Sequence, residues 1–330
     1  MTKPSLLVSR AIAPEVIARL GQHFDVRANQ ADEPWSPAQL MDALRGRQAL
    51  FATGSERIDA ALLQACPALR ICANMSVGFN NFDVAAMTAH RVLGTNAPGV
   101  LTETTADFGF ALLLAAARRV TEGERYLRAG QWKRWQYDTL VGCDVHGSTL
   151  GILGMGRIGQ ALARRGHFGF GMQVIYHNRS RLEDSLERET GARYVSKDEL
   201  LRSADHLVLV LPYSASSHHA IGAAELALMK PTATLVNIAR GGIVDDAALA
   251  QALRDKRIAA AGLDVYEGEP TLHPGLLALS NVVLTPHIGS ATGPTRLAMA
   301  NLAADNLIGF FGGNGPLNPV NPEVLNELAA

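Results

Sequence analysis

Short apolar segments alternate with longer amphipathic segments along most of the 330 residues. In the first third of the chain the apolar segments predict buried strands, at 6–9, 49–53, 69–78 and 91–95. Apolar residues at helical spacing lie between them, over 14–24 and 37–47. Such βα alternation is typical of a parallel sheet covered by helices.

The second half repeats this pattern after a long apolar helix expected over 102–120. Further strands are predicted, at 150–153, 174–176, 205–212, 233–240, 259–266 and 281–288. A last helix over 292–311 is expected to cross back onto the first sheet, because the first domain has too few helices of its own. We therefore predict an α/β protein with two parallel-sheet domains of the Rossmann-like or flavodoxin-like kind. A discontinuous substrate-binding domain takes 1–100 and 293–330, a dinucleotide-binding Rossmann domain takes 101–292, and small ligands are expected in a cleft between them.

Composition narrows the class of protein. Hydrophobic residues make up 48% of the chain, and 30 Lys and Arg nearly balance 31 Asp and Glu, so neither a nucleic-acid partner nor a membrane surface is expected. The longest apolar run, 108–117, is much shorter than the about 20 residues that cross a bilayer. Three cysteines without a CxxC motif favour reduced thiols and a cytoplasmic location.

The strongest local motif is a glycine-rich loop between a strand and a helix. Gly154, Gly156 and Gly159 follow the strand at 150–153, and a second strand follows the helix. In a βαβ unit these glycines allow a tight turn, close approach of a pyrophosphate and close packing of helix on sheet. The helix N-terminus then presents free N–H groups to the phosphates. The motif predicts a dinucleotide site.

The residues after the second strand indicate which dinucleotide is bound. An Asp or Glu usually stands there and binds the ribose hydroxyls of NAD. Here the chain has Asn178, Arg179, Ser180 and Arg181 instead. Because arginine suits a 2′-phosphate, we expect NADPH as the preferred cofactor, with NADH also possible.

Several segments together resemble one enzyme family. They are SVGFNNFD at 76–83, GVLTETTADFGFALLLAAARRV at 99–120, GCDVHGSTLGILGMGRIG at 142–159, VNIARGGIVDD at 236–246, AAGLDVYEGEP at 260–270 and LTPHIGSAT at 284–292. In this order they are similar to the D-isomer-specific 2-hydroxyacid dehydrogenases, most of all to bacterial glyoxylate/hydroxypyruvate and 2-ketogluconate reductases. The first 70 residues match this family only in their βα rhythm.

The resemblance implies a catalytic trio of Arg240, Glu269 and His287. Each follows a predicted strand, at the edge where open α/β sheets bind ligands. Arg240 is expected to grip the substrate carboxylate with its planar fork and polarise the neighbouring carbonyl. His287 is expected to give a proton to the carbonyl oxygen, and Glu269 to favour the protonated ring. Glu267 is a rival for the glutamate role, although the family position is the glutamate before Pro270.

The resemblance also implies the remaining contacts. Cofactor-binding residues are expected at Thr105, Gly154, Gly156, Arg157, Ile158, Gly159, Asn178, Arg179, Ser180, Arg181, Leu211, Pro212, Ile238, Ala239, Arg240, Asp264, His287, Gly289 and Ser290. The substrate is expected to contact Ser76, Val77, Gly78, Trp135, Arg240 and His287. Trp135 would reach the partner's pocket in a homodimer. Thr105 and Asp264 have structural alternatives, as a helix N-terminal residue and a structural acid.

The predicted activity is the NADPH-preferring reduction of small 2-oxo acids to D-2-hydroxy acids, with glyoxylate, hydroxypyruvate and 2-ketogluconate as candidates. A D-3-phosphoglycerate dehydrogenase and a dinucleotide-sensing corepressor on the same fold are the alternatives. Gly242 stands where the family branch commonly has proline, which bears on substrate preference. No metal site is expected, because the adjacent His218 and His219 should point apart and no cysteine or carboxylate completes a set.

Overall fold

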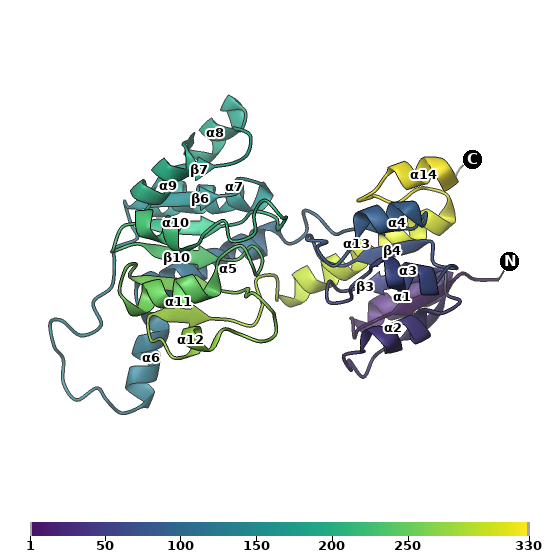
Figure 1. Cartoon of the computed structure of the whole chain (residues 1–330), viewed down its shortest axis with the longest axis horizontal. Coiled ribbons are helices and arrows are strands. Elements are labelled where there is room, and N and C mark those ends of the chain that lie inside the picture. The colour runs from purple at the N-terminus through teal and green to yellow at the C-terminus, as the bar shows by residue number, and fades with distance from the viewer. Residues whose placement is uncertain (1, 329–330) are drawn as a thin grey trace. The chain divides into compact units, whose positions relative to one another are not determined.

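The computed structural model describes residues 2–328 and divides into two compact units. The first unit contains Met1–Leu101 and Thr292–Ala330, and the second contains Thr102–Ala291. Each unit is an α/β body with one parallel sheet (Figure 1). The chain thus leaves the first unit once and returns to it with its last helices.

The first unit has a five-stranded sheet in the order β2-β1-β3-β4-β5. Its strands are β1 (Ser5–Val8), β2 (Asp25–Ala28), β3 (Ala49–Ala52), β4 (Ile71–Asn74) and β5 (Leu93–Thr95). Its helices are α1 (Pro14–His23), α2 (Pro37–Leu44), α3 (Ala60–Ala65), α4 (Val84–Ala89), α13 (Gly293–Gly312) and α14 (Glu323–Leu328). Helix α13 packs against α1 and β4, and Arg19 on α1 pairs with Asp305 on α13. The late helix therefore completes the cover of this sheet.

The second unit has a seven-stranded sheet in the order β12-β11-β10-β9-β6-β7-β8. Its strands are β6 (Thr149–Leu153), β7 (Gln173–His177), β8 (Ala192–Tyr194), β9 (His206–Leu209), β10 (Thr234–Asn237), β11 (Ala260–Leu263) and β12 (Val282–Leu284). Its helices are α5 (Thr102–Ala117), α6 (Val120–Arg128), α7 (Arg157–Arg164), a π-helical turn η1 (Arg165–Gly169), α8 (Asp184–Thr190), α9 (Lys197–Ser203), α10 (Ala223–Leu228), α11 (Asp246–Arg254) and α12 (Pro274–Leu277).

The strand order of the second unit reverses beside β6. From β6 the chain moves outward through β7 to β8, then returns to β9 on the other side of β6 and continues to β12. Open α/β sheets bind ligands at such a reversal, outside the carboxyl ends of the strands. The loop after β6 therefore lies where a dinucleotide is expected to bind.

The helix expected over 102–120 is two helices. Helix α5 ends at Ala117, and Arg119 adopts a left-handed conformation with φ of 53° before α6 begins at Val120. Most of α5 is apolar and packs on the sheet through residues such as Leu113. Helix α6 has no buried residue. The chain therefore turns away at the point where the apolar run gives way to charged residues.

No helix within residues 2–328 is long and apolar enough to cross a membrane.

Candidate active site

Five strands of the second unit end in register at one edge of the sheet. Leu153 of β6 pairs with Leu209 of β9, which pairs with Asn237 of β10. Asn237 in turn pairs with Leu263 of β11, and Leu263 with Leu284 of β12. Because all these strands are parallel, the residues that follow them emerge on the same side. The glycine loop and the three expected catalytic residues all lie in segments that leave this edge.

The three glycines meet three different surroundings. Gly154 has a φ of 104°, and a Cβ there would lie 2.6 Å from the Leu211 backbone nitrogen. A Cβ at Gly159 would lie 2.4 Å from the Gly154 carbonyl oxygen. At Gly156, the N-cap of α7, no atom from elsewhere in the described chain lies within 4 Å of the position that a Cβ would take. Two glycines thus close the turn, and the third leaves the helix N-terminus open for a phosphate.

A buried hydroxyl on α5 also suits a bound cofactor. Thr105 on α5 is 7% exposed, and its hydroxyl has no hydrogen-bond partner among the described residues. Its methyl group would lie 3.6 Å from a Cβ at Gly289, which follows β12. Since buried polar groups are normally paired, this hydroxyl is available to a ligand. Together with the open space at Gly156, it shows that the residues present fit a dinucleotide.

The four residues that follow β7 have separate partners. Asn178 turns inward, where its side-chain oxygen accepts from the Met155 N–H at 2.7 Å. It therefore braces the glycine loop. Arg179 and Ser180 are exposed, and among the described residues no hydrogen bond or ion pair is recorded for the Arg179 side chain.

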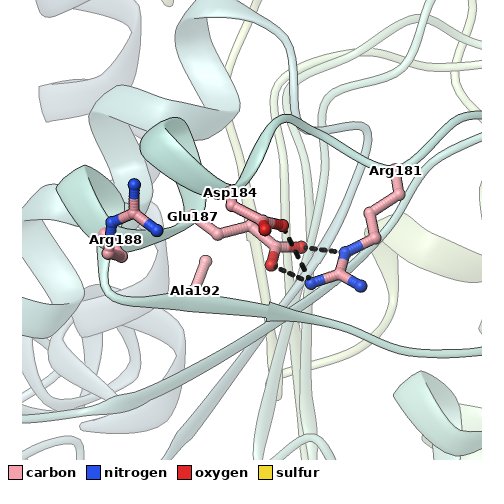
Figure 2. A pocket seen from close by; sticks show the side chains of 5 residues that line it. All are labelled: Arg181, Asp184, Glu187, Arg188 and Ala192. Atoms are coloured by element: carbon pink, nitrogen blue, oxygen red, sulfur yellow. Dashed lines mark hydrogen bonds and ion pairs between the residues drawn. The ribbon is translucent and has the colours of Figure 1, made fainter.

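Arg181 is bound by acids of the following helix. Its Nε and Nη2 donate to Glu187 at 3.0 and 2.6 Å, and Nη2 lies 3.5 Å from Asp184. Figure 2 shows this arginine turned toward the two carboxylates. Glu187 is 9% exposed and also accepts from the Tyr176 hydroxyl at 2.7 Å. The two arginines expected at a 2′-phosphate therefore differ, because only Arg181 already has an acidic partner.

The other expected cofactor contacts lie on the same edge. Arg157 and Ile158 begin α7, Leu211 and Pro212 follow β9, Ile238 and Ala239 follow β10, and Gly289 and Ser290 follow β12.

The structure brings His287 and Glu269 together. His287 Nδ1 lies 2.8 Å from Glu269 Oε2, which leaves Nε2 as the nitrogen that faces away from the carboxylate. His287 has a φ of 54°. The side chain of His287 is 47% exposed and that of Glu269 33%. The ring is therefore oriented by an acid and remains accessible to a substrate.

Burial and charge oppose each other at Glu269 and Arg240. Burial raises the pKa of Glu269, but hydrogen bonds from His287 and the Tyr266 N–H and the charge of Arg240 outweigh it, so its pKa lies below the usual value. Burial lowers the pKa of Arg240, and Glu269 opposes that shift. Arg240 Nη1 donates to the Ala239 carbonyl oxygen at 2.7 Å. A carboxylate, an imidazole and a guanidinium are thus electrostatically coupled on one sheet edge.

Asp264 fastens the segment that carries His287. It is 2% exposed. Its Oδ1 accepts from the Ile288 N–H and from the Thr285 hydroxyl, at 2.8 and 2.7 Å, and its Oδ2 accepts from the Gly289 N–H at 2.8 Å. Asp264 therefore holds the segment from Thr285 to Gly289 in place.

Tyr266 also belongs to this site, although no motif of the sequence singled it out. Its N–H donates to Glu269 Oε1 at 2.8 Å, and its hydroxyl accepts from the Thr285 N–H at 2.9 Å. Desolvation is the main reason that its pKa rises to about 12. An aromatic residue two positions after Asp264 was the available signal, but its bond to Thr285 depends on the neighbouring strand.

The loop of Ser76, Val77 and Gly78 lies in the first unit, directly after β4 and Met75. Its carbonyl oxygens are engaged: Ser76 O accepts from the Ala97 N–H, Val77 O from Asn96, and Gly78 O from the Ser76 hydroxyl. Within residues 2–328 no hydrogen bond is recorded from the N–H groups of these three residues. Free N–H groups in a loop suit an anion such as a carboxylate.

Trp135 lies in the segment that follows α6, and its exposed fraction is 78%. Trp132, in the same segment, is 55% exposed. More than half of the surface of each tryptophan is therefore exposed.

The expectation that His218 and His219 point apart is wrong. Their rings stack with centroids 3.9 Å apart. His219 adopts a left-handed conformation with φ of 49°, so the two side chains do not diverge as they would in a regular helix or strand. A carboxylate also joins them, since His219 Nε2 lies 3.0 Å from Glu267 Oε2. Glu267 and Glu269 therefore pair with different histidines.

A seven-stranded parallel sheet with a glycine loop at its strand-order reversal defines a dinucleotide-binding enzyme fold. Residues 110–289 match the model of the family described as D-isomer specific 2-hydroxyacid dehydrogenase, NAD binding domain. The chain is 48% identical over 328 residues to a glyoxylate reductase of Thermococcus onnurineus, covering 98% of both chains. It is 46% identical over 323 residues to glyoxylate/hydroxypyruvate reductase B of Klebsiella pneumoniae, covering 98% of this chain and 99% of the relative.

A solved structure is similar over almost the whole chain. It is the NADPH-dependent glyoxylate/hydroxypyruvate reductase of Sinorhizobium meliloti in complex with NADP and malonate, with a TM-score of 0.86, 36% identity and 97% of each chain covered. The chain therefore belongs to the D-isomer-specific 2-hydroxyacid dehydrogenase family. It is an oxidoreductase that acts on CH–OH groups with a nicotinamide dinucleotide as cofactor.

Proposed function

We propose that this enzyme reduces small 2-oxo acids with NADPH, converting glyoxylate to the achiral glycolate and hydroxypyruvate to a D-2-hydroxy acid, with 2-ketogluconate as a further candidate substrate. The observation that carries the proposal is the His287–Glu269 pair, 2.8 Å apart, on the same sheet edge as Arg240 and the glycine loop. The relatives named above as glyoxylate and glyoxylate/hydroxypyruvate reductases support these substrates.

The proposed chemistry divides between three side chains. A nicotinamide dinucleotide, which Gly156 and Thr105 would help to hold, would supply the hydride for the carbonyl carbon. Arg240 binds the substrate carboxylate in two places and orients the carbonyl. His287 gives the proton on Nε2 to the carbonyl oxygen, and Glu269, ionised because its pKa is low, stabilises the positive ring before transfer.

Replacing His287 tests the proton donor. The variant His287→Ala is expected to lower kcat with glyoxylate by about 10² to 10⁴-fold, the usual contribution of one general acid. NADPH binding, followed by fluorescence titration, should remain. His146→Ala, at another exposed histidine of the second unit, is the matched control. A threefold change in rate corresponds to a free-energy change of only about RT. Turnover within about threefold of the wild type would therefore refute the assignment.

The cofactor preference is proposed to depend on Arg179. Support comes from the absence of an acid after β7, from the exposed Arg179 side chain, and from NADP in the Sinorhizobium meliloti structure. Arg181 is proposed to act indirectly, since Glu187 holds it. Ser180, the exposed hydroxyl between them, is the neighbouring donor for the phosphate.

The variant Arg179→Asp tests this preference. It is expected to shift the ratio of kcat/KM for NADPH over NADH by about 10- to 100-fold toward NADH, the worth of one or two charge-assisted hydrogen bonds. Arg188→Asp, an exposed arginine on α8, is the matched charge control and should leave the ratio unchanged. An unchanged ratio in Arg179→Asp would remove the phosphate argument.

Two further parts of the proposal concern assembly and location. Ser76, Val77 and Gly78 are proposed to bind the substrate carboxylate through their N–H groups. The enzyme is proposed to form a homodimer in the cytoplasm in which Trp135 reaches the partner's substrate. All three cysteines are free, as a reducing compartment favours.

A further inference from the structure

Three side chains of the second unit form a compact cluster that the proposed reduction does not use. His219 Nε2 lies 3.0 Å from Glu267 Oε2, and the His218 ring stacks on the His219 ring with an interplanar angle of 23°. One nitrogen of each histidine and one oxygen of Glu267 all lie within 4.8 Å of one another. Two imidazoles and a carboxylate at this spacing are a ligand set.

The backbone explains why neighbouring histidines share one side. His219 has a φ of 49°, a left-handed conformation that reverses the usual divergence of adjacent side chains. Its N–H donates to the Gly242 carbonyl oxygen at 2.8 Å, and the Ile221 N–H donates to Ile243 at 3.1 Å. The conformation is therefore fixed by pairing with the segment that follows Arg240.

We propose that His218, His219 and Glu267 bind a divalent transition-metal ion, with Zn²⁺ as the best match. Imidazole nitrogen and carboxylate oxygen are ligands of Zn²⁺ at about 2.0–2.2 Å, and three protein ligands leave the fourth position to water. Two ligand atoms of one tetrahedral ion lie about 3.3 Å apart by this geometry, close to the present separation of His219 Nε2 and Glu267 Oε2. His218 is exposed, so its ring has room to turn its nitrogen inward.

A hydroxyl behind His218 supports the same assignment. The Tyr213 hydroxyl lies 3.1 Å from His218 Nδ1. When Nδ1–H donates to this oxygen, the lone pair of Nε2 is left for a metal, as is usual for ligating histidines. Gly242 makes space for this arrangement: its φ is 77°, and a Cβ there would lie 3.0 Å from the Tyr213 ring and 3.5 Å from His218 Nδ1.

The test is a Zn²⁺ titration of the full-length chain without an affinity tag, after removal of metal, in competition with a chromophoric chelator. The wild type is expected to take up Zn²⁺ at this site and not to take up Mg²⁺, which prefers oxygen ligands. His219→Asn and Glu267→Gln should each weaken Zn²⁺ binding by at least about tenfold, and Tyr213→Phe by about tenfold, as for lost supporting hydrogen bonds. Asparagine accepts the left-handed conformation at 219, and circular dichroism verifies that each variant is folded.

Two other groups of the second unit could take up Zn²⁺ instead. They are the His287–Glu269 pair and the half-exposed thiol of Cys143. The variants His287→Asn and Cys143→Ser should therefore retain the wild-type affinity. The proposal is overturned if the wild type takes up no Zn²⁺, or if uptake is lost in His287→Asn or Cys143→Ser and kept in His219→Asn and Glu267→Gln.

Discussion

Glu187 is the buried acid that binds the loop following β7. The Arg181 hydrogen bond lowers the pKa of Glu187 most, burial raises it, and the Tyr176 hydroxyl lowers it further, so the net shift is downward. The same hydroxyl accepts from the Leu182 N–H at 2.8 Å. One buried carboxylate thus connects both sides of the loop that presents Arg179 and Ser180.

This network predicts a pH-dependent contribution to stability. Because folding lowers the pKa of Glu187, its contribution is full above the unfolded value of about 4.3 and is lost as the pH falls through the lower folded value. The variant Glu187→Gln should therefore unfold at lower urea concentration than the wild type at pH 7, with the difference shrinking below about pH 4. Glu189→Gln, exposed on the same helix, is the control. A difference between wild type and Glu187→Gln that did not change with pH would contradict the account.

Helix α6 and the segment after it form an arm of the second unit that carries exposed apolar side chains. In Figure 1 this arm extends from the end of α5 away from the sheet. Its exposed fractions include 58% for Leu127, 55% for Trp132, 78% for Trp135 and 90% for Tyr137. Exposed apolar groups gathered on one segment are typical of a protein interface, and a twofold dimer is the commonest assembly.

From the exposed apolar side chains of this arm, we predict that the enzyme sediments as a dimer. Leu127→Glu combined with Trp132→Glu is expected to shift the sedimentation coefficient to that of a monomer, because charge at the centre of an apolar interface is costly. Trp135→Ala should keep the dimer and raise KM for the 2-oxo acid several-fold. A wild-type monomer at assay concentration would contradict both expectations.

Elements were predictable from the sequence where their signal is local. The glycine loop, the buried strands and the strand ends that carry Arg240 and His287 follow from apolar runs and their boundaries. The edge strands β2 and β8 were missed, because their few residues alternate between exposed and partly buried or buried. The break between α5 and α6 depends on a single left-handed residue, Arg119.

Pairings between distant segments were not predictable from the sequence. Glu267 meets His219 across 48 residues, and Tyr266 meets Thr285 through adjacent strands. From the sequence alone, Arg181 is predicted to bind a phosphate. In the structure, Glu187 of the next helix binds its side chain instead. In each case the partner is chosen by tertiary packing, which a pattern of residue types does not contain.

At the scale of the whole molecule, the chain combines a five-stranded and a seven-stranded parallel sheet. The match to the family model, at residues 110–289, falls within the second unit. The proposed carboxylate-binding loop at 76–78 belongs to the first unit. The family match therefore places the dinucleotide-binding region in the second unit, whereas the proposed carboxylate-binding loop lies in the first.

The most direct test of the proposed function is the initial rate of the wild-type enzyme with NADPH and NADH crossed against four acids. These are glyoxylate, hydroxypyruvate, 2-ketogluconate and 3-phosphohydroxypyruvate. The account predicts the highest kcat/KM with NADPH and either glyoxylate or hydroxypyruvate. A clear preference for 3-phosphohydroxypyruvate would instead indicate a phosphoglycerate dehydrogenase. Dinucleotide binding without turnover of any acid would indicate a sensor. Either result would contradict the account.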